Sequence, residues 1–559
     1  MCISGVGSFK CCGIVSLNGT ELAGITTDVK LIGDKNNPDS TKSELTALPG
    51  QIVADGKDGA VLKLILRDVN NNLLPGQTVE FITALGNTAI TDNDEPQDGV
   101  YTATLKGTTA GTATIKVKVN GTELTGISAD VILIGDKNNP DGTKSELTAL
   151  PDTIVANGTA ESKLKLILRD INGNLITGQE VIFTSTLENT TVGGTSENTG
   201  GTYTASLTGT TSGKATIGVT VNGTALTITA AEVTLTADKD NPDSGKSELT
   251  AAPETIVANN TDESVLKLTL RDVNGNLISG QTVELKTALE NTVITMTPGD
   301  QDGVYTATLK GTKAGTATVT VTVNGTELAG LTKDVTLIGD KNNPDSSKSE
   351  LVVTPETITA DDTDTSALKL ILRDVNNNLI TGQTVEFSTA LANTTITAKP
   401  EAPQGSYNAV LKGKTAGNAE IKVKVNGADF GVASKTVKLI ADKSTAKMII
   451  TNLNTDKHAV ADTVSVNNLE IKVVDANDNP ISGVNIKVTE KTQPAMVMID
   501  NAEGVTGADG VFKPGVRSKI QNVSLSVSAK DAGGIDITED YALIFDLVKF
   551  TLKSAIVTN

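Results

Sequence analysis

Apolar and polar residues alternate with a period of two along most of this chain. In the segment VLKLILRD, Leu62, Leu64 and Leu66 share one face of an extended backbone. The segments VYTATLKG (100–107) and TATIKVKVNG (112–121) alternate in the same way. Because successive side chains of a strand point to opposite faces, this period predicts half-buried β-strands. No stretch of useful length has the helical period, so we expect an all-β protein.

Turn-forming residues separate the predicted strands. Asn120-Gly121 is the dipeptide that supplies positive φ in a tight two-residue hairpin. The loop DVNNNLLPGQ (68–77) is rich in asparagine and contains Pro-Gly, which predicts a hairpin loop between two strands. About seven short antiparallel strands in ~100 residues are typical of an immunoglobulin-like β-sandwich, which is therefore the predicted fold.

The whole pattern returns at a fixed interval. The tetrapeptide KSEL begins at residues 42, 144, 246 and 348, so the period is 102 residues. One tyrosine per repeat falls on the inward face of its strand, where we expect it to fill the core with its hydroxyl at the sandwich edge. These tyrosines are Tyr101, Tyr203, Tyr305 and Tyr407. In a fifth, diverged unit, Phe512 stands at the tyrosine position.

The period divides the chain into domains. Residues 1–15 match no part of the repeat, and residues 16–39 match its C-terminal strands. Because the strands that should precede residue 16 are missing, we expect a fragment of a longer chain. The predicted immunoglobulin-like domains are 40–141, 142–243, 244–345 and 346–444, followed by the diverged fifth domain at 445–559.

A nearly constant line, GDKNNPDSTKSEL in its first copy (33–45), separates the predicted sandwiches. Its proline interrupts a strand, and its Asn and Asp residues favour turns, so it is the expected joint. A joint of constant length holds neighbours in one geometry, whereas a Gly/Ser linker would let them tumble. We therefore expect the tandem sandwiches to form a rod-like array.

The segments LKLILRDVNNNLLPGQTVEF (62–81) and GVYTATLKGTTAGTATIKV (99–117) resemble the group 1 bacterial immunoglobulin-like domains of the intimin/invasin family. These motifs are strands and turns, so they indicate a fold and identify no receptor. In that family an N-terminal β-barrel anchors the protein in the outer membrane. A tandem stalk then projects outward, and a lectin-like module often forms the tip.

The resemblance implies a non-enzymatic stalk in the extracellular passenger region of a cell-surface adhesin, which attaches cells to host cells or other surfaces. The barrel and the Trp- and Cys-bearing lectin-like module are missing from this sequence. We expect an unidentified host-cell or surface receptor to be contacted through 445–559. There Met496 and Met498 could form an adaptable apolar surface, or could simply pack beside a core face of Val497 and Ile499.

Charge and composition exclude several partners. The formal net charge is −19, from 66 acidic and 47 basic residues, which opposes binding to nucleic acid or anionic membranes. Cysteines occur only as Cys2, Cys11 and Cys12, so no disulfide framework crosses the repeats. The chain has a single histidine, His458, which is expected in a surface loop, so no His-based triad can occur in the repeats.

No insertion interrupts the repeat period to form a cleft, so we expect no enzyme activity and no small-molecule substrate.

We expect no catalytic, cofactor-binding or metal-ligating residues, but two polar clusters keep calcium open as an alternative. The segment DANDNP (475–480) resembles the inter-domain calcium motif of cadherins, yet it falls in the predicted hairpin loop rather than at a joint. The joint residues Asp34, Asn36, Asn37 and Asp39 are better placed for a shared ion. One alternative interpretation is therefore a calcium-stiffened biofilm adhesin. A second, independent alternative is a secreted or phage-borne immunoglobulin-like binding module.

Overall fold

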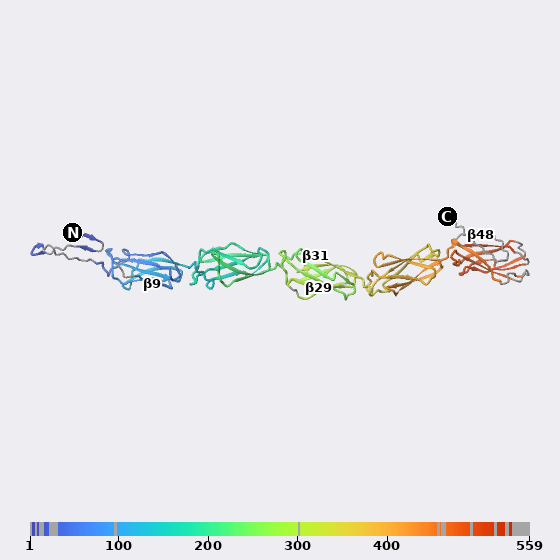
Figure 1. The fold of residues 1–559 in the computed structure, drawn as a ribbon, viewed down its shortest axis with the longest axis horizontal. Helices are drawn as coiled ribbons and strands as arrows, with labels where there is room; N and C mark the ends of the chain where they lie inside the picture. The colour runs from blue at the N-terminus through green and yellow to red at the C-terminus, as the bar shows by residue number, and fades with distance from the viewer. Residues whose placement is uncertain are drawn as a thin grey trace. The chain divides into compact units, whose positions relative to one another are not determined.

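The computed structural model shows a chain built almost entirely from β-strands (Figure 1). The one helix among the described residues is the short 3-10 helix η1 (Lys443–Thr445). Cys2, Cys11, Cys12 and His458 lie outside the described residues. The structure describes residues 3–5, 8–10, 16–21, 32–93, 98–299, 302–454, 459, 466–491, 496–518, 523–531 and 536–538.

The chain divides into two compact units. The first contains residues 1–248, 269–281 and 300–304, and the second contains 249–268, 282–299 and 305–559. The hydrogen bonds between consecutive sandwiches lie within one unit or the other.

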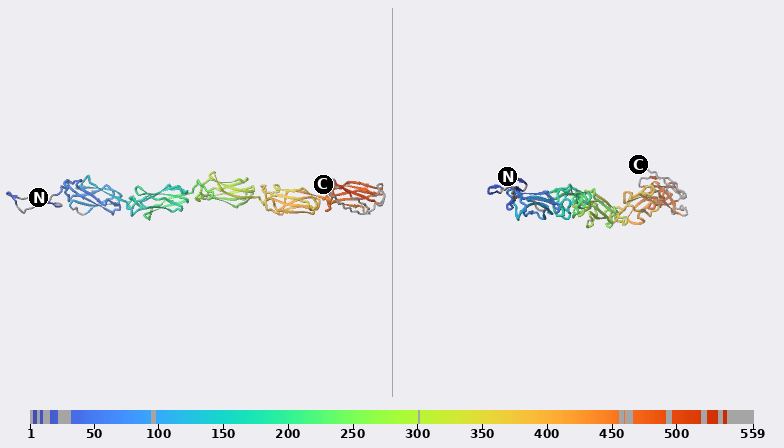
Figure 2. Two further views of the ribbon diagram at one scale, coloured as in Figure 1. Left: turned by 90° about the horizontal axis from the view of Figure 1, so that it is seen from above. Right: turned by 60° about the vertical axis from the view of Figure 1, so that its left-hand side comes forward.

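The first unit contains the first two sandwiches, each made of two sheets (Figures 1 and 2). In the first sandwich, one sheet has the strand order β5 (Glu44–Leu48), β7 (Ala60–Ile65), β10 (Val100–Gly107), β9 (Thr88–Asp92). The other sheet has the order β6 (Gln51–Val53), β13 (Ala129–Ile134), β11 (Gly111–Val119), β8 (Val79–Ile82), with β12 (Thr122–Glu123) beside β11. In the second, they are β14 (Glu146–Leu150), β16 (Ser162–Ile167), β20 (Thr202–Gly209), β18 (Thr190–Val192) and β15 (Thr153–Val155), β23 (Ala231–Thr236), β21 (Gly213–Val221), β17 (Val181–Ser185). Short strands add to them: β19 (Ser196–Asn198) on β20 and β22 (Thr224–Ala225) on β21. Before them lie the pairs β1 (Ile3–Gly5) with β2 (Ser8–Lys10) and β3 (Ser16–Leu17) with β4 (Thr20–Glu21).

The third and fourth sandwiches repeat this plan, and the fifth departs from it in the edge strand of its second sheet. The third sandwich has β24 (Glu248–Ala252), β26 (Ser264–Thr269), β29 (Val304–Gly311), β28 (Thr292–Met296) and β25 (Thr255–Val257), β31 (Thr326–Ile338), β30 (Gly315–Val323), β27 (Val283–Thr287). The fourth has β32 (Glu350–Thr354), β34 (Ser366–Ile371), β37 (Ser406–Gly413), β36 (Thr394–Lys399) and β33 (Thr357–Thr359), β39 (Ala428–Ile440), β38 (Gly417–Val425), β35 (Val385–Ser388). The fifth has β40 (Lys447–Asn452), β41 (Asn467–Val474), β46 (Gly515–Ser518), β43 (Val497–Asp500), with β45 (Val511–Phe512) on β41, and β44 (Glu503–Val505), β42 (Val484–Glu490), β47 (Leu525–Asp531), β48 (Asp536–Thr538).

The side chains that the alternation placed inward form the sandwich cores. Leu62, Leu64 and Leu66 have no exposed surface, and Tyr101 is buried beside them. Each buried leucine contributes about 2 kcal/mol through the apolar area that it removes from water. The prediction of an all-β protein made of immunoglobulin-like sandwiches is confirmed.

The local hairpin prediction is also confirmed. Asn120 and Gly121 have φ values of 53° and 86°, and they connect β11 to β12 as a two-residue turn. One pairing in each of the first four sandwiches departs from the antiparallel prediction; in the first, β6 runs parallel to β13. The chain leaves one sheet after β5 and joins the other at β6, so β6 reaches the last strand of its own sandwich in the parallel sense.

The hairpin prediction for loop 68–77 holds only locally: Arg67 and Leu73 form an isolated antiparallel bridge, but the flanking strands do not pair with each other. The preceding strand β7 pairs with β5 and β10, whereas the following strand β8 pairs with β11 in the opposite sheet. The loop therefore crosses from one sheet to the other. Leu74 is buried at the crossing, and its carbonyl accepts a 2.7 Å hydrogen bond from the Tyr101 hydroxyl.

The tyrosine hydroxyl holds this crossing in place. In the first repeat it donates to the carbonyl of Leu74 and accepts a 2.8 Å hydrogen bond from the backbone N–H of Gln77. Burial raises the pKa of Tyr101, because the phenolate would be less well solvated there. The expectation of a core tyrosine with its hydroxyl at the sandwich edge is confirmed for Tyr101, Tyr203 and Tyr407.

The fifth unit makes the same two hydrogen bonds with a different residue. Phe512 pairs with Ile471 in the ladder, as Tyr101 pairs with Leu64, so it does stand at the tyrosine position. Thr506 supplies the missing hydroxyl: it donates to the carbonyl of Ile481 at 2.8 Å and accepts from the N–H of Val484 at 3.0 Å. The sequence comparison missed this exchange because Thr506 belongs to a different segment from Phe512.

Candidate functional site

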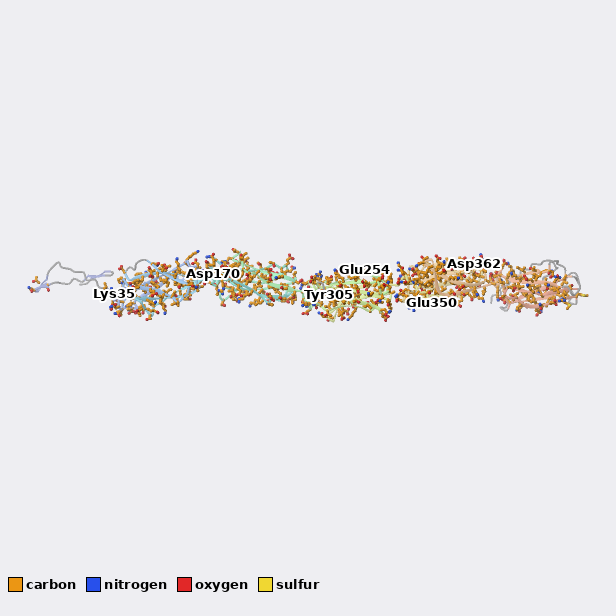
Figure 3. The ribbon with its side chains drawn as sticks, turned by 90° about the horizontal axis from the view of Figure 1, so that it is seen from below. Lys35, Asp170, Glu254, Tyr305, Glu350 and Asp362 are labelled. Carbon is orange, nitrogen blue, oxygen red and sulfur yellow. The ribbon has the colours of Figure 1, made fainter. Side chains whose placement is uncertain are left out.

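In the second to fifth sandwiches, the asparagine-rich loop lies at the joint with the preceding sandwich. In the second repeat this loop carries Asp170, which Figure 3 labels. The expectation that the DANDNP loop (475–480) lies away from a joint is therefore wrong. The reason is strand direction. Glu146, just after the joint, pairs with Ile167, just before the loop, so antiparallel pairing brings both to the same end.

A buried carboxylate organises the loop. Asp170 has no exposed surface, and each of its oxygens accepts two hydrogen bonds from N–H donors. Oδ1 accepts from the backbone N–H groups of Asn172 at 2.9 Å and Asn174 at 2.8 Å. Oδ2 accepts from Asn174 Nδ2 at 2.9 Å and from the backbone N–H of Asp136 in the joint at 2.9 Å. The carboxylate therefore ties the loop to the joint and orients the Asn174 amide.

The two asparagines reach the backbone of the preceding sandwich. Asn172 Nδ2 donates to the carbonyl of Ala54 at 3.1 Å. Asn174 Nδ2 donates to the carbonyl of Thr108 at 3.0 Å, and its Oδ1 accepts from the N–H of Ala110 at 2.7 Å. Three hydrogen bonds thus cross the joint, and all their partners on the preceding sandwich are main-chain groups.

We call this set of one aspartate and two asparagines the clasp. The three hydrogen bonds across the joint recur at each of the four joints between the five sandwiches, with lengths between 2.7 and 3.1 Å. The clasps that make them are Asp170, Asn172 and Asn174; Asp272, Asn274 and Asn276; Asp374, Asn376 and Asn378; and Asp475, Asn477 and Asn479.

The joint residues singled out from the sequence form turns. Asp34 accepts hydrogen bonds from the backbone N–H of Asn36 at 3.0 Å and from the Asn37 amide at 2.6 Å. Asp39 accepts from the hydroxyl of Thr41 at 2.6 Å and from its backbone N–H at 2.7 Å. The Thr41 hydroxyl, followed by the Thr41 N–H, lowers the pKa of Asp39 below its ordinary value. These four residues therefore shape the linker itself.

The N–H groups that donate to the clasp carboxylate occupy the oxygens that a calcium ion would need. A carboxylate has about four lone-pair sites, and in the clasp all of them face N–H donors of the protein. A calcium ion needs those same oxygens and would have to displace the donors. Within the described part of the chain, no group of three or more His, Cys, Asp or Glu residues is placed to hold a metal ion.

Removal of divalent cations is therefore expected to leave the stability of the protein unchanged. The joint carboxylates already have N–H partners, so the folded state gains nothing from an added ion at these positions. The measurement is the Tm of the full chain by calorimetry with EDTA, and again after excess calcium is restored. A Tm that falls with EDTA and recovers with calcium would contradict this expectation and support the ion-stiffened joint.

Acid is expected to weaken the clasp loop of the first repeat. Burial raises the pKa of Asp68, but hydrogen bonds from the side chain and N–H of Asn72 and from the N–H groups of Asp34 and Asn70 outweigh it, so the pKa lies below its ordinary value. An unfolded aspartate takes up its proton near pH 4, before the folded one does. The stability that Asp68 adds is thus present above about pH 4 and is lost as the pH falls through the folded pKa.

The measurement is the free energy of unfolding of the wild type and of Asp68→Asn between pH 7 and pH 2. We expect the wild type to be more stable at pH 7 and the difference between the two proteins to narrow in acid. A difference that stays constant over the whole range would show that Asp68 does not carry this stability.

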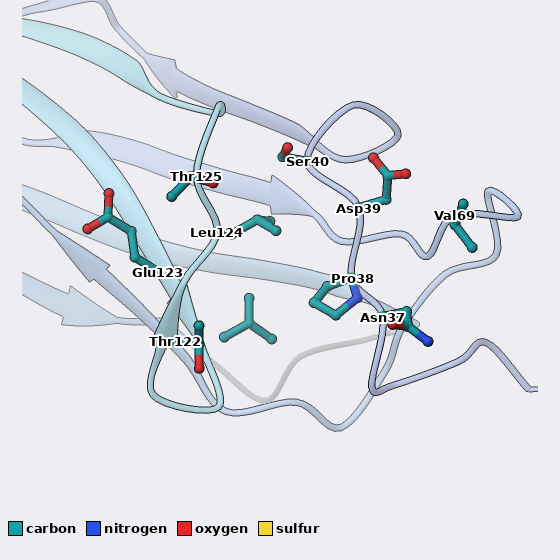
Figure 4. A pocket seen from close by; sticks show the side chains of 10 residues that line it. Asn37, Pro38, Asp39, Ser40, Val69, Thr122, Glu123, Leu124 and Thr125 are labelled. Carbon is teal, nitrogen blue, oxygen red and sulfur yellow. The ribbon is translucent and has the colours of Figure 1, made fainter.

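The surface of the first sandwich has two grooves. The larger, about 530 Å³, lies between the joint residues 37–40 and the hairpin residues 122–125 (Figure 4). Its carboxylates, Asp39 and Glu123, come from opposite walls, and Asp39 is engaged by Thr41. The smaller, about 230 Å³, opens between the two sheets beside Tyr101. The hydroxyl–carboxylate contact beside the larger groove, from Thr41 to Asp39, belongs to the turn of the linker.

The fifth unit exposes apolar side chains at one edge. Met498 on β43 is 58% exposed, and Val505 on the following strand β44 is 56% exposed. Val497 and Ile499 alternate with Met498 and pack into or against the core, as one sequence interpretation expected. Met496 and Met498 remain accessible to solvent, so they are available as a contact surface.

The sequence of the repeats matches a known family model. The model for invasin domain 3 matches four times, at residues 39–134, 141–238, 243–340 and 345–442. The chain belongs to the invasin domain 3 family. The resemblance to the intimin/invasin family is therefore confirmed, and the tandem invasin domain 3 repeats are the sandwiches whose clasps are described above.

Among curated proteins, the invasin domain 3 chain is similar to the inverse autotransporter adhesin YeeJ of Escherichia coli (strain K12). The identity is 27% over 528 residues, which is 89% of this chain and 21% of that relative. The chain thus spans about a fifth of the length of this relative. No helix in the described part is long and apolar enough to cross a membrane.

Solved structures with similar chains include two adhesion proteins. The Escherichia coli adhesin FdeC is 24% identical and covers 55% of this chain and 100% of its own, with a TM-score of 0.42. Invasin, a bacterial integrin-binding protein, is 25% identical and covers 75% of this chain and 82% of its own, with a TM-score of 0.37.

Proposed function

We propose that this chain is a non-enzymatic segment of the extracellular stalk of a cell-surface adhesin. The observation that carries the proposal is the repetition of one sandwich and one set of joint hydrogen bonds along a chain of the invasin domain 3 family. Near-copies joined in the same way suit a spacer, which needs length rather than a different surface on each module. The similarity to an inverse autotransporter adhesin supports the same role.

In this proposal the repeats act mechanically and hold a distal surface away from the cell. Attachment to the outer membrane is part of this proposal, and the similarity to an inverse autotransporter adhesin supports it. The rod-like arrangement of the sandwiches remains a prediction. The domain limits predicted from the sequence, 40–141, 142–243, 244–345, 346–444 and 445–559, define the modules of the stalk.

The fifth domain, 445–559, is the proposed contact with a host-cell or surface receptor. It differs in sequence from the four near-copies, and the family model matches end at residue 442. Its exposed Met498 and Val505 offer adaptable apolar surface at neighbouring strands. No nucleic acid enters this role, since the net charge of −19 opposes binding to a polyanion. A spacer also needs no small-molecule substrate.

The test begins with an immunoblot of intact cells, before and after external protease, with an antibody against one repeat. A band well above 57.6 kDa that disappears on surface digestion is the expected result. A soluble band near 57.6 kDa that survives digestion would overturn the adhesin proposal.

The second part of the test measures adhesion of cells whose protein lacks 445–559, beside cells whose protein lacks the repeat 244–345. The first deletion is expected to abolish attachment and the second to preserve it. The opposite pattern would place receptor contact in the repeats.

A further inference from the structure

Among the described residues, the hydrogen bonds from the clasp to the preceding sandwich go to main-chain groups and to none of its side chains. The groups that it contacts on the preceding sandwich are the carbonyls at positions 54 and 108 and the N–H at position 110, with their counterparts in later repeats. The residue at position 108 is threonine in three repeats and Lys414 in the fourth. The residue at position 110 is alanine, except for Ser212 in the second repeat. The hydrogen bonds keep their lengths within 0.3 Å through these changes.

The clasp also forms when the linker differs. The last joint replaces the proline-containing line with ADKSTAK (441–447) and contains the helix η1. Asp475 is also one residue closer to its predecessor than the period requires, because the pairs that span this joint are separated by 117 residues instead of 118. Even so, Asn477 donates to Ala360 and Asn479 bonds to the backbone at 414 and 416. The clasp, rather than the linker, is therefore the constant part of the joint.

The clasp is organised by its own repeat. In the first repeat, Asp68 accepts from the N–H groups of Asn70 at 2.9 Å and Asn72 at 2.8 Å and from the Asn72 amide at 3.0 Å. These are the contacts that the later clasps make. In every repeat these hydrogen bonds join residues of the same loop, so the carboxylate positions both asparagines from within its own repeat.

The backbone groups that the clasp meets need partners. Ala54 is fully buried, and the half-buried segment 108–110 leaves the end of one sheet for the other, beyond the ladder pairs of β10 and β11. A buried main-chain group without a hydrogen bond costs free energy comparable to a lost bond. The clasp of the next repeat supplies these partners in the way that a side chain caps a helix end.

We propose that the clasp is a general docking surface for the end of any sandwich of this kind. Its partner is a preceding repeat that presents two carbonyls and one N–H at the positions of 54, 108 and 110. The docking of one sandwich onto the preceding one then depends only on the geometry of the clasp loop. If a whole 102-residue repeat is removed or exchanged, the joint therefore forms again between the new neighbours. This property holds whether or not the chain serves in adhesion.

The experiment removes one period and asks whether the joint re-forms. In a chain that lacks 142–243, Asn274 and Asn276 take the places of Asn172 and Asn174 beside the first sandwich. Hydrogen–deuterium exchange of the Ala110 amide reports the contact, since its N–H is bonded to the clasp. Four proteins are compared: the full chain, the full chain with Asn172→Ala/Asn174→Ala, the deletion, and the deletion with Asn274→Ala/Asn276→Ala.

We expect the Ala110 amide to be protected in the full chain and in the deletion. In both doubly substituted proteins it should exchange about tenfold faster, the factor that corresponds to one lost hydrogen bond. The matched control is Asn70→Ala/Asn72→Ala in the full chain, which makes the same change in a loop on the other side of the first sandwich and should leave Ala110 unaffected. Slow exchange in the strand that contains Leu62 verifies in every protein that the first sandwich is folded.

Two results would overturn the proposal. If Ala110 exchanges as fast in the simple deletion as in the doubly substituted full chain, then each clasp fits only its natural neighbour. If the substitutions Asn172→Ala/Asn174→Ala leave its exchange unchanged, then the clasp does not hold the joint.

Discussion

Replacing Asp170 by alanine is expected to lower the free energy of unfolding of the second sandwich by about 3–5 kcal/mol. The substitution leaves four N–H donors without their acceptor: those of Asp136 and Asn172, and two from Asn174. Asp170 has no exposed surface, so water replaces the carboxylate poorly. Among the described residues, Asp170 forms no salt bridge, and its charge is stabilised by four charge-assisted hydrogen bonds.

Calorimetry of the full chain measures this change as a separate transition. For a domain of this size, a loss of 3 kcal/mol moves the transition of one sandwich down by more than about 10 °C. Asp170→Asn keeps the shape but turns an N–H₂ group toward donors, so we expect an intermediate loss of about 2 kcal/mol. Glu161→Ala, at an exposed position of the same sandwich, is the control. Equal transitions for Asp170→Ala and Glu161→Ala would contradict the role of the carboxylate.

Thr506→Val is expected to destabilise the fifth sandwich by about 2–3 kcal/mol. The two side chains have nearly the same shape, but valine cannot donate to the carbonyl of Ile481 or accept from the N–H of Val484. Thr506 is only 3% exposed, so both backbone groups would remain buried without a partner. The same logic applies to Tyr203→Phe in the second sandwich, where the hydroxyl contacts Ile176 and Gln179.

Thr506→Ser separates the hydroxyl from the methyl group. It keeps both hydrogen bonds and should cost about 1 kcal/mol, the value of one buried methyl group. Thermal unfolding of the full chain, with the transition of the fifth sandwich assigned by hydrogen exchange, distinguishes the two variants. If Thr506→Val were as stable as Thr506→Ser, the hydroxyl would not be the counterpart of the tyrosine.

The strands were predictable because their signal is local. Leu62, Leu64 and Leu66 lie inward because a strand alternates its faces, and this follows from the sequence of one segment. The Asn120-Gly121 turn needs only two residues that tolerate positive φ. The family resemblance rests on the same segments, and for this reason it indicated the fold correctly.

The sites that were missed depend on residues far apart in the sequence. Loop 68–77 has the composition of a hairpin, but the pairing of β8 with β11 decides where it leads. The DANDNP loop (475–480) carries the residue types of a calcium motif, yet its carboxylate faces four N–H donors. Sequence pattern alone cannot distinguish a carboxylate that accepts N–H groups from one that binds a cation, because both need the same oxygens.

The sequence by itself therefore determined the elements of this protein: the strands, the tight turns, the period and the family. The tertiary structure decided which sheet each strand joins, which hydroxyl holds the crossing in the fifth unit, and that the asparagine-rich loops face the preceding repeat. The physical reason is range. Strand and turn preferences act between neighbours in the chain, whereas the hydrogen bonds of the clasp join atoms up to 118 residues apart, and only the folded chain brings those atoms within 3.1 Å.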